Sequence, residues 1–199
     1  MNMLECARTN FFSCEYTRIA NEHLLKARCA INGLYNNHPD YDQQDILHHD
    51  AIMWSIISVV FSAMSIESFI YNYAASYLND KYVKEHLDKL GVVDKWVIIP
   101  RLITGKQINK SECAFNLLKE VIGFRNEYVH NKSEPLTYKN WGKEDVGLYL
   151  SQAEKGIKAI EYLAVFIRDI DPTYPVMGNF GVEWKVKKTN RKQWVTPEN

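Results

Sequence analysis

Apolar residues recur every three or four positions along most of the chain, which is the period of an amphipathic α-helix. Gly, Pro and Asn residues interrupt this pattern and mark helix ends, as at residues 33–39 and at Gly91. A break or kink is expected at Pro100, and Ser111 is expected to cap the helix that follows. The fold class is therefore all-α, a bundle of four to five helices. The predicted helical segments are 16–35, 46–78, 80–90, 93–103, 111–132 and 144–170.

The segment 46–78 is apolar over most of its circumference, as expected of a helix packed on several sides. Residues 51–66 carry no charge, but they number only 16 and include four serines, whereas a membrane span needs about 20 mostly apolar residues. A buried core helix is expected here, and no membrane. Glu67 is the only charged residue between Asp50 and Asp80, so its carboxylate needs a partner.

Arg125 lies in the middle of the apolar side of the helix 111–132, between Leu118, Ile122 and Val129. A guanidinium is costly to bury unpaired, so Arg125 must pair or face a cleft. Glu67 is the obvious candidate partner. Two interpretations stay open: an ion pair that fixes the helix register, or a carboxylate that orients Arg125 within a functional site.

Composition excludes several classes of protein. Lys plus Arg and Asp plus Glu number 24 each, so no global charge indicates nucleic acid, and any such binding must come from a local patch. The four cysteines form no CxxC pair, which favours free thiols in a cytoplasmic protein, and the N-terminus has no apolar run of a signal peptide. His48 and His49 diverge by about 100° on a helix, so a shared metal ion is not expected.

The tail, residues 172–199, has a different pattern. Phe180, Val182, Trp184 and Val186 alternate with polar residues or glycine, which is the period of an extended or β-like strand. Basic residues interleaved with aromatics can bind single-stranded nucleic acid through phosphate contacts and stacking. The alternative is a tail whose aromatics dock on the domain while its lysines stay solvated. The candidate nucleic-acid-binding residues are Lys132, Trp184, Lys185, Lys187 and Lys188.

The sequence Arg125-Asn126-x-x-x-His130, placed on an amphipathic helix of an all-α chain, resembles the motif of the HEPN family. The resemblance covers roughly residues 16–171, leaving an N-terminal extension (1–15) and the tail outside it. It implies a four-helix, bundle-like domain that dimerises with the two motif helices facing each other. It also implies a metal-independent and cofactor-independent endoribonuclease site in the cleft between protomers. Glu67 matches the acidic residue that several members carry on the preceding helix.

The implied chemistry is consistent with these residue types. RNA cleavage without metal uses the ribose 2′-OH as nucleophile and leaves a 2′,3′-cyclic phosphate and a 5′-OH. Arg125 would stabilise the phosphorane, His130 would act as acid or base, and Asn126 would position the phosphate or His130.

Two alternatives to a nuclease stay open at this point. One is a non-catalytic module of the same fold that binds RNA or a protein partner, and the other is a purely structural bundle. A toxin–antitoxin or phage-defence setting, with a neutralising antitoxin protein as partner, is what the family suggests.

Overall fold

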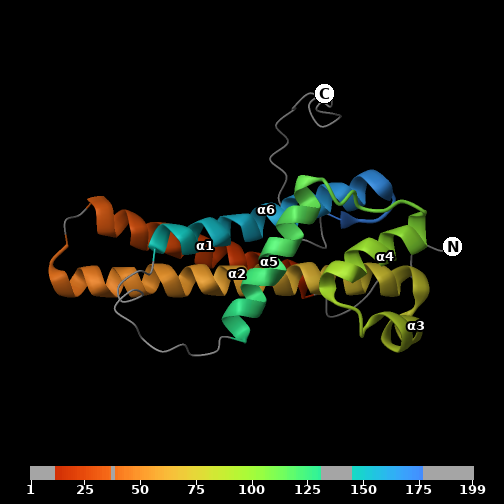
Figure 1. Cartoon of the computed structure of the whole chain (residues 1–199), viewed down its shortest axis with the longest axis horizontal. Coiled ribbons are helices and arrows are strands. Elements are labelled where there is room, and N and C mark those ends of the chain that lie inside the picture. Colours follow the sequence, from red (N-terminus) through yellow and green to blue (C-terminus); the bar gives the residue numbers. More distant parts are fainter. Residues whose placement is uncertain (1–11, 37–38, 131–144, 177–199) are drawn as a thin grey trace, which may run out of the picture.

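The computed structural model describes residues 12–36, 39–130 and 145–176, and these residues form helices and turns without a strand (Figure 1). The all-α prediction is therefore confirmed for this part of the chain. The helices are α1 (Ser13–Asn36), α2 (Tyr41–Leu78), α3 (Asp80–Tyr82), α4 (Val92–Thr104), α5 (Cys113–Val129) and α6 (Val146–Ile170), with a π-helical turn η2 (Val83–Leu87) after α3.

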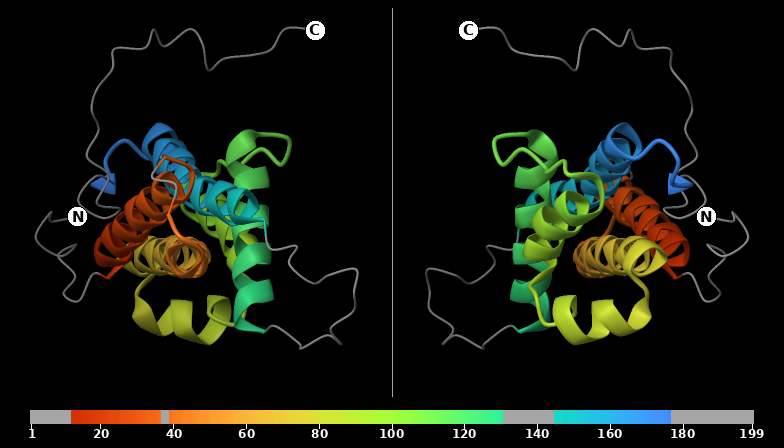
Figure 2. Two further views of the ribbon diagram at one scale, coloured as in Figure 1. Left: turned by 90° about the vertical axis from the view of Figure 1, so that its left-hand side faces the viewer. Right: turned by 90° about the vertical axis from the view of Figure 1, so that its right-hand side faces the viewer.

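The 38-residue helix α2 is the element that all the other long helices pack against. Helices α1 and α6 run beside it along the long axis of the molecule, and α5 crosses this group at a steep angle (Figures 1 and 2). The short elements α3 and η2 lie at the C-terminal end of α2. This arrangement places α5 across α2 within reach of Glu67, which lies in the C-terminal half of α2.

The main core forms around the C-terminal half of α2, where side chains of α4, α5 and α6 meet it. Trp96 is fully buried and stacks on Phe69 with ring centroids 5.9 Å apart, and its indole N–H donates to the Ile66 carbonyl oxygen at 3.3 Å. These contacts fix α4 against α2. The largest fully buried side chains are Ile66, Phe69, Ile70, Tyr73, Trp96, Ile99, Ile108, Leu118, Ile160, Leu163 and Ile167.

Several predicted helix ends differ from the structure. α1 begins at Ser13, inside the predicted extension, and α2 begins at Tyr41 because Asp40 caps it by accepting a hydrogen bond from the Gln43 N–H. The prediction that Ser111 caps α5 is wrong. Its hydroxyl donates to the Asn109 side chain instead, and Glu112 occupies the cap position. The predicted tail lies outside the described residues from 177 onward.

The predicted break at Pro100 is also absent, because α4 runs continuously from Val92 to Thr104. Proline removes one backbone hydrogen bond from a helix interior. Here Ile99 and Pro100 are both buried, so packing against the core offsets the loss.

Helix α2 is long and apolar enough to cross a membrane by length and composition, and half of its most apolar 18-residue window is buried inside the protein. The core helix of a soluble protein has both properties. The residues buried from α2 between 51 and 66 lie on the side that meets α1 and α6, as predicted for a core helix. The absence of a membrane stays a prediction.

Asp171, directly after α6, ties the end of that helix to α2. Its buried carboxylate accepts hydrogen bonds from the Tyr77 hydroxyl at 2.6 Å, the Thr173 hydroxyl at 2.7 Å and the Tyr73 hydroxyl at 3.1 Å. Burial acts to raise the pKa of Asp171, but these hydrogen bonds outweigh it and hold the pKa below its ordinary value. Burial and the neighbouring carboxylate raise the pKa of Tyr73 above its ordinary value.

Helices α2 and α6 approach closely where Gly156 faces Ser62. A Cβ added at Gly156 would lie 2.7 Å from the Ser62 Oγ and 3.0 Å from its Cβ. The Ser62 hydroxyl is buried and makes no hydrogen bond to any described residue, as is also true of Ser58 one turn earlier. The small side chains therefore serve close packing rather than a polar network.

We expect Tyr77→Phe to lower the free energy of unfolding at pH 7 by about 1 kcal/mol, because one hydrogen bond to a carboxylate is lost. A carboxylate with a lowered pKa stabilises the fold above its unfolded pKa of about 3.9, and this contribution is lost as the pH falls through the folded pKa. Urea unfolding at pH 7 and pH 3 should thus show a loss that shrinks in acid. Tyr35→Phe, at a side chain 71% exposed, is the control and should change nothing. An equal loss at both pH values contradicts the assigned role of Asp171.

We expect Gly156→Ala to destabilise the protein by about 1–3 kcal/mol, because the added methyl group overpacks the contact with Ser62. Adding Ser62→Ala should recover part of the loss. The matched control is Gly123→Ala on α5, where an added Cβ meets nothing within 4 Å and helix propensity improves. Thermal unfolding of the four proteins measures these differences. Equal effects at the two glycines would contradict the close approach.

Candidate functional site

The side chain of Arg125 leaves α5 toward α2, where it meets Glu67. The Arg125 Nη2 lies 3.7 Å from the Glu67 Oε2, so the ion pair expected from two lone charges is present. Leu117, Leu118 and Val121 are buried one to two turns earlier on α5 and hold the helix in place. The pairing hypothesis from the sequence is confirmed, while the role of the pair stays open.

The pair is loose and partly exposed. Arg125 and Glu67 side chains are 31% and 39% exposed, and 3.7 Å is longer than an N–H···O hydrogen bond of about 2.7–3.2 Å. A pair of this kind contributes at most about 1 kcal/mol. This stabilisation is small for an ion pair whose role is to fix the helix register. The Arg125 guanidinium also retains N–H donors for another ligand.

Asn126 holds Arg125 from its own helix. The Arg125 Nη1 donates to the Asn126 Oδ1 at 3.0 Å, and Asn126 is itself exposed. Asn126 also marks the end of α5, because its carbonyl oxygen accepts the His130 backbone N–H at 3.0 Å. Asn126 thus contacts both Arg125 and His130.

His130 is the C-cap residue directly after α5, and it is exposed. Five residues correspond to roughly 500° of helix rotation, so the His130 and Arg125 side chains diverge by about 140° around α5. The chain brings Arg125, Asn126 and Glu67 together, but His130 lies on a different side of the helix from Arg125. A single chain therefore does not bring all four predicted residues together.

Glu67, Arg125 and Asn126 form one group of contacting side chains, the Arg125 cluster. Lys95 also belongs to it, through Glu67, and is not predicted from the sequence. Only 3% of Lys95 is exposed, and its Nζ lies 4.0 Å from the Glu67 Oε1 and 3.5 Å from the Asp88 Oδ1. The sequence does contain an indication of its burial, because Lys95 directly precedes the apolar segment that begins at Trp96. Arg125 likewise lies among apolar residues of its helix. The nearby charged residues Lys89 and Asp94 instead suggest that Lys95 lies on the surface.

The residues predicted to bind nucleic acid, Lys132, Trp184, Lys185, Lys187 and Lys188, all lie outside the described residues. Their roles stay predictions.

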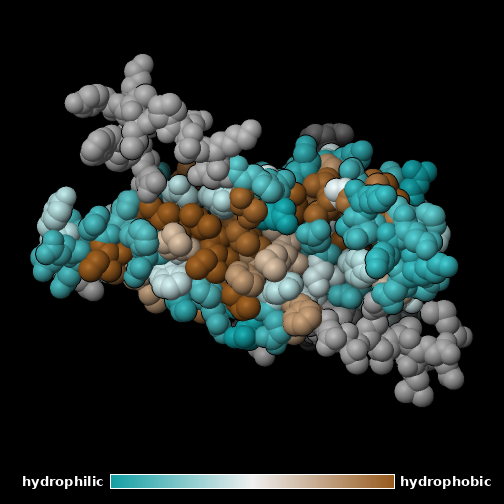
Figure 3. Space-filling view, turned by 90° about the horizontal axis from the view of Figure 1, so that it is seen from below, coloured by the Kyte–Doolittle hydropathy of each residue, from teal (hydrophilic) through white to brown (hydrophobic). Residues whose placement is uncertain are grey.

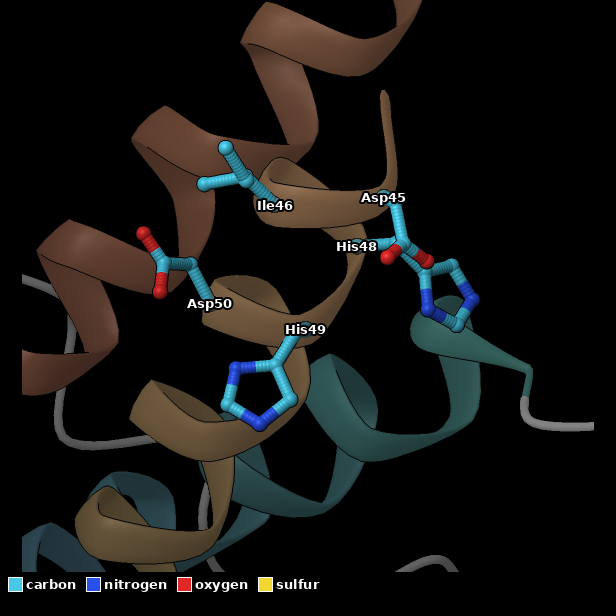
Figure 4. A pocket seen from close by; sticks show the side chains of 5 residues that line it. All are labelled: Asp45, Ile46, His48, His49 and Asp50. Carbon is cyan, nitrogen blue, oxygen red and sulfur yellow. The ribbon is translucent and has the colours of Figure 1, made fainter. Parts of the chain in front are cut away.

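A pocket near the start of α2 is lined by Asp45, Ile46, His48, His49 and Asp50 (Figure 4). The two imidazole rings point in different directions, and within residues 12–36, 39–130 and 145–176 no group of three metal-ligating side chains could hold an ion. Nineteen residues along α2 separate His48 from Glu67, which corresponds to about 28 Å. The pocket is therefore not part of the Arg125 cluster.

Compared with known proteins, the chain matches no family model, no curated protein and no solved structure. The roles of Arg125 and its neighbours therefore rest on their chemistry and geometry, and the family resemblance stays a prediction from the motif.

A double-mutant cycle with Glu67→Gln and Arg125→Gln should give a coupling energy below about 1 kcal/mol, because the pair is loose and solvated. Urea unfolding of the four proteins measures it. The pair Lys155–Glu120, whose charged atoms lie 2.6 Å apart at similar exposure, provides the reference cycle. A coupling of several kcal/mol would show instead that the Glu67–Arg125 pair is a structural ion pair.

Proposed function

We propose that this protein is a metal-independent endoribonuclease of HEPN type. The observation that carries the proposal is a half-exposed guanidinium, Arg125, held by Glu67 and Asn126 within one and a half turns of an exposed histidine. A planar guanidinium is suited to a phosphoryl group, and a histidine is suited to proton transfer near neutral pH.

The proposed reaction is an internal transesterification. A base removes the proton of the ribose 2′-OH, the 2′-oxygen forms a bond to phosphorus, and the bond from phosphorus to the 5′-oxygen breaks. An acid then gives a proton to the departing 5′-oxygen, so the products are a 2′,3′-cyclic phosphate and a 5′-OH. Arg125 stabilises the charge of the phosphorane, and His130 takes or gives a proton. Asn126 keeps the guanidinium oriented.

The proposal includes a homodimer. Arg125 and His130 diverge around α5, and two proton transfers need two groups, so the partner's His130 supplies the second. The apolar surface of α2 supports association, since Met53 is 40% exposed and Ile57, Val60 and Met64 follow at helical spacing as half-buried residues. Glu67 continues this stripe by one turn. Figure 3 shows apolar surface over the middle of the side on which α2 lies.

The test is incubation of the purified protein with single-stranded RNA in excess EDTA, followed by analysis of the new ends. Cyclic phosphate ends are expected, with the cleavage rate at least about 10²-fold lower in His130→Ala and in Arg125→Ala, because each removes a group acting in the transition state. Arg101→Ala and His49→Ala, at exposed residues of α4 and α2 that contact neither Arg125 nor Glu67 in the described residues, are the matched controls and should cleave normally.

Two outcomes would contradict the proposal. Binding of RNA without cleavage, lost in Arg125→Ala, identifies the non-catalytic binding module instead. Cleavage by a protein that sedimentation shows to be monomeric overturns the composite dimer site.

A further inference from the structure

Lys95 is a second cation on the carboxylate that holds Arg125. Its Nζ approaches one oxygen of Glu67 at 4.0 Å, while Arg125 approaches the other at 3.7 Å. Glu67 therefore lies between two positive charges that come from different helices, α4 and α5. Lys95 also pairs with a second carboxylate, because its Nζ lies 3.5 Å from the Asp88 Oδ1.

The position of Lys95 is set by its neighbour in the chain. Trp96 is locked into the core by its stack on Phe69 and by its hydrogen bond to the carbonyl oxygen of Ile66, the residue before Glu67. A lysine held in this way loses little side-chain entropy when it binds a ligand. Lys95 also contacts the partly exposed carboxylate of Glu67 and the exposed carboxylate of Asp88, so its ammonium lies just beneath the surface.

Glu67 balances the charge of Lys95 and Arg125 but makes no direct hydrogen bond to either. Both distances exceed the hydrogen-bond range, and the Glu67 side chain is 39% exposed, so the carboxylate can turn outward into water. Carboxylate and phosphate present paired oxygens that the same guanidinium fork accepts. A phosphate in place of the Glu67 carboxylate would contact both Lys95 and Arg125.

We propose that Lys95 and Arg125 together bind a phosphodiester of RNA, and that the Glu67 carboxylate occupies this place until the phosphate displaces it. The inference rests on the proposed function. It adds a phosphate-binding residue, Lys95, and gives Glu67 the role of an internal competitor. Glu67 then sets the RNA affinity, because its charge must be moved away from the two cations before the phosphate can bind them.

The experiment measures binding of a single-stranded RNA oligonucleotide in the His130→Ala background, which keeps the RNA intact, at several salt concentrations. Glu67→Gln should tighten binding about three- to tenfold, because the competing charge is gone. Lys95→Met should weaken binding about tenfold and lower the slope of log affinity against log salt by about 0.7, the value for one phosphate contact on a single strand. The gain from Glu67→Gln should be smaller when Lys95→Met is also present.

Two control variants make the same charge changes on helix α6, outside the Arg125 cluster. Glu154→Gln removes a carboxylate that pairs with Arg28, and Lys158→Met removes an exposed lysine of α6. Both should leave the affinity and the salt slope unchanged. Should Lys95→Met fail to fold, Glu67→Gln alone tests the inference, and an unchanged RNA affinity in that variant overturns it.

The outcomes separate the two proposals. RNA binding with unchanged affinity and salt slope in Lys95→Met and Glu67→Gln overturns this inference and leaves the nuclease proposal standing. An altered thermal stability of Lys95→Met with an unchanged salt slope shows that Lys95 is only structural, and overturns it too. Failure of the parent protein to bind or cleave RNA at all overturns the proposed function as well.

Discussion

The need to cover one long apolar helix governs the structure. Helix α2 cannot bury its circumference against a single neighbour, so α1, α4, α5 and α6 each take part of it. Small residues allow this: Gly156 meets Ser62, and the Ser65 hydroxyl donates to the Ser13 carbonyl oxygen at 2.8 Å. Backbones can approach closely only where such side chains face each other. The side of α2 that the described helices leave uncovered is therefore a consequence of how many of them pack against it.

The same constraint explains the charge cluster. A carboxylate on a helix packed on several sides lies near helices that cross it, and cations on those helices are drawn to it. Glu67 attracts Lys95 from α4 and Arg125 from α5, although their sequence positions are far apart. Glu67 and Arg125 are partly exposed, so hydration limits what their pair adds to stability, whereas Lys95 is buried. The cluster therefore brings charges together without locking them.

Sequence periodicity was enough to place the long helices, since burial of an amphipathic stripe decides them. The Glu67–Arg125 contact was also predictable, because each residue was a lone charge among apolar ones. Two finer predictions failed for local reasons. The Ser111 hydroxyl binds the Asn109 side chain instead of capping α5, and α4 continues through Pro100 because that residue packs in the core. The contacts of Asp171 with Tyr73 and Tyr77 could not be predicted from the sequence. The partners are 98 and 94 positions apart along the chain, and only tertiary packing brings them together.

The anchoring of Asp171 and Tyr174 also determines where the chain leaves the helices. Tyr174 packs edge-on against Tyr73 at 4.8 Å between ring centroids, and Val176 is buried. Tyr73 and Tyr77 follow Glu67 by six and ten residues, which is about 9–15 Å along α2. Tyr174, which packs on Tyr73, therefore lies about two to three turns of α2 from the level of Glu67 along the helix axis. A segment joined after Val176 would meet the Arg125 cluster as an intramolecular ligand only where its length spans this separation.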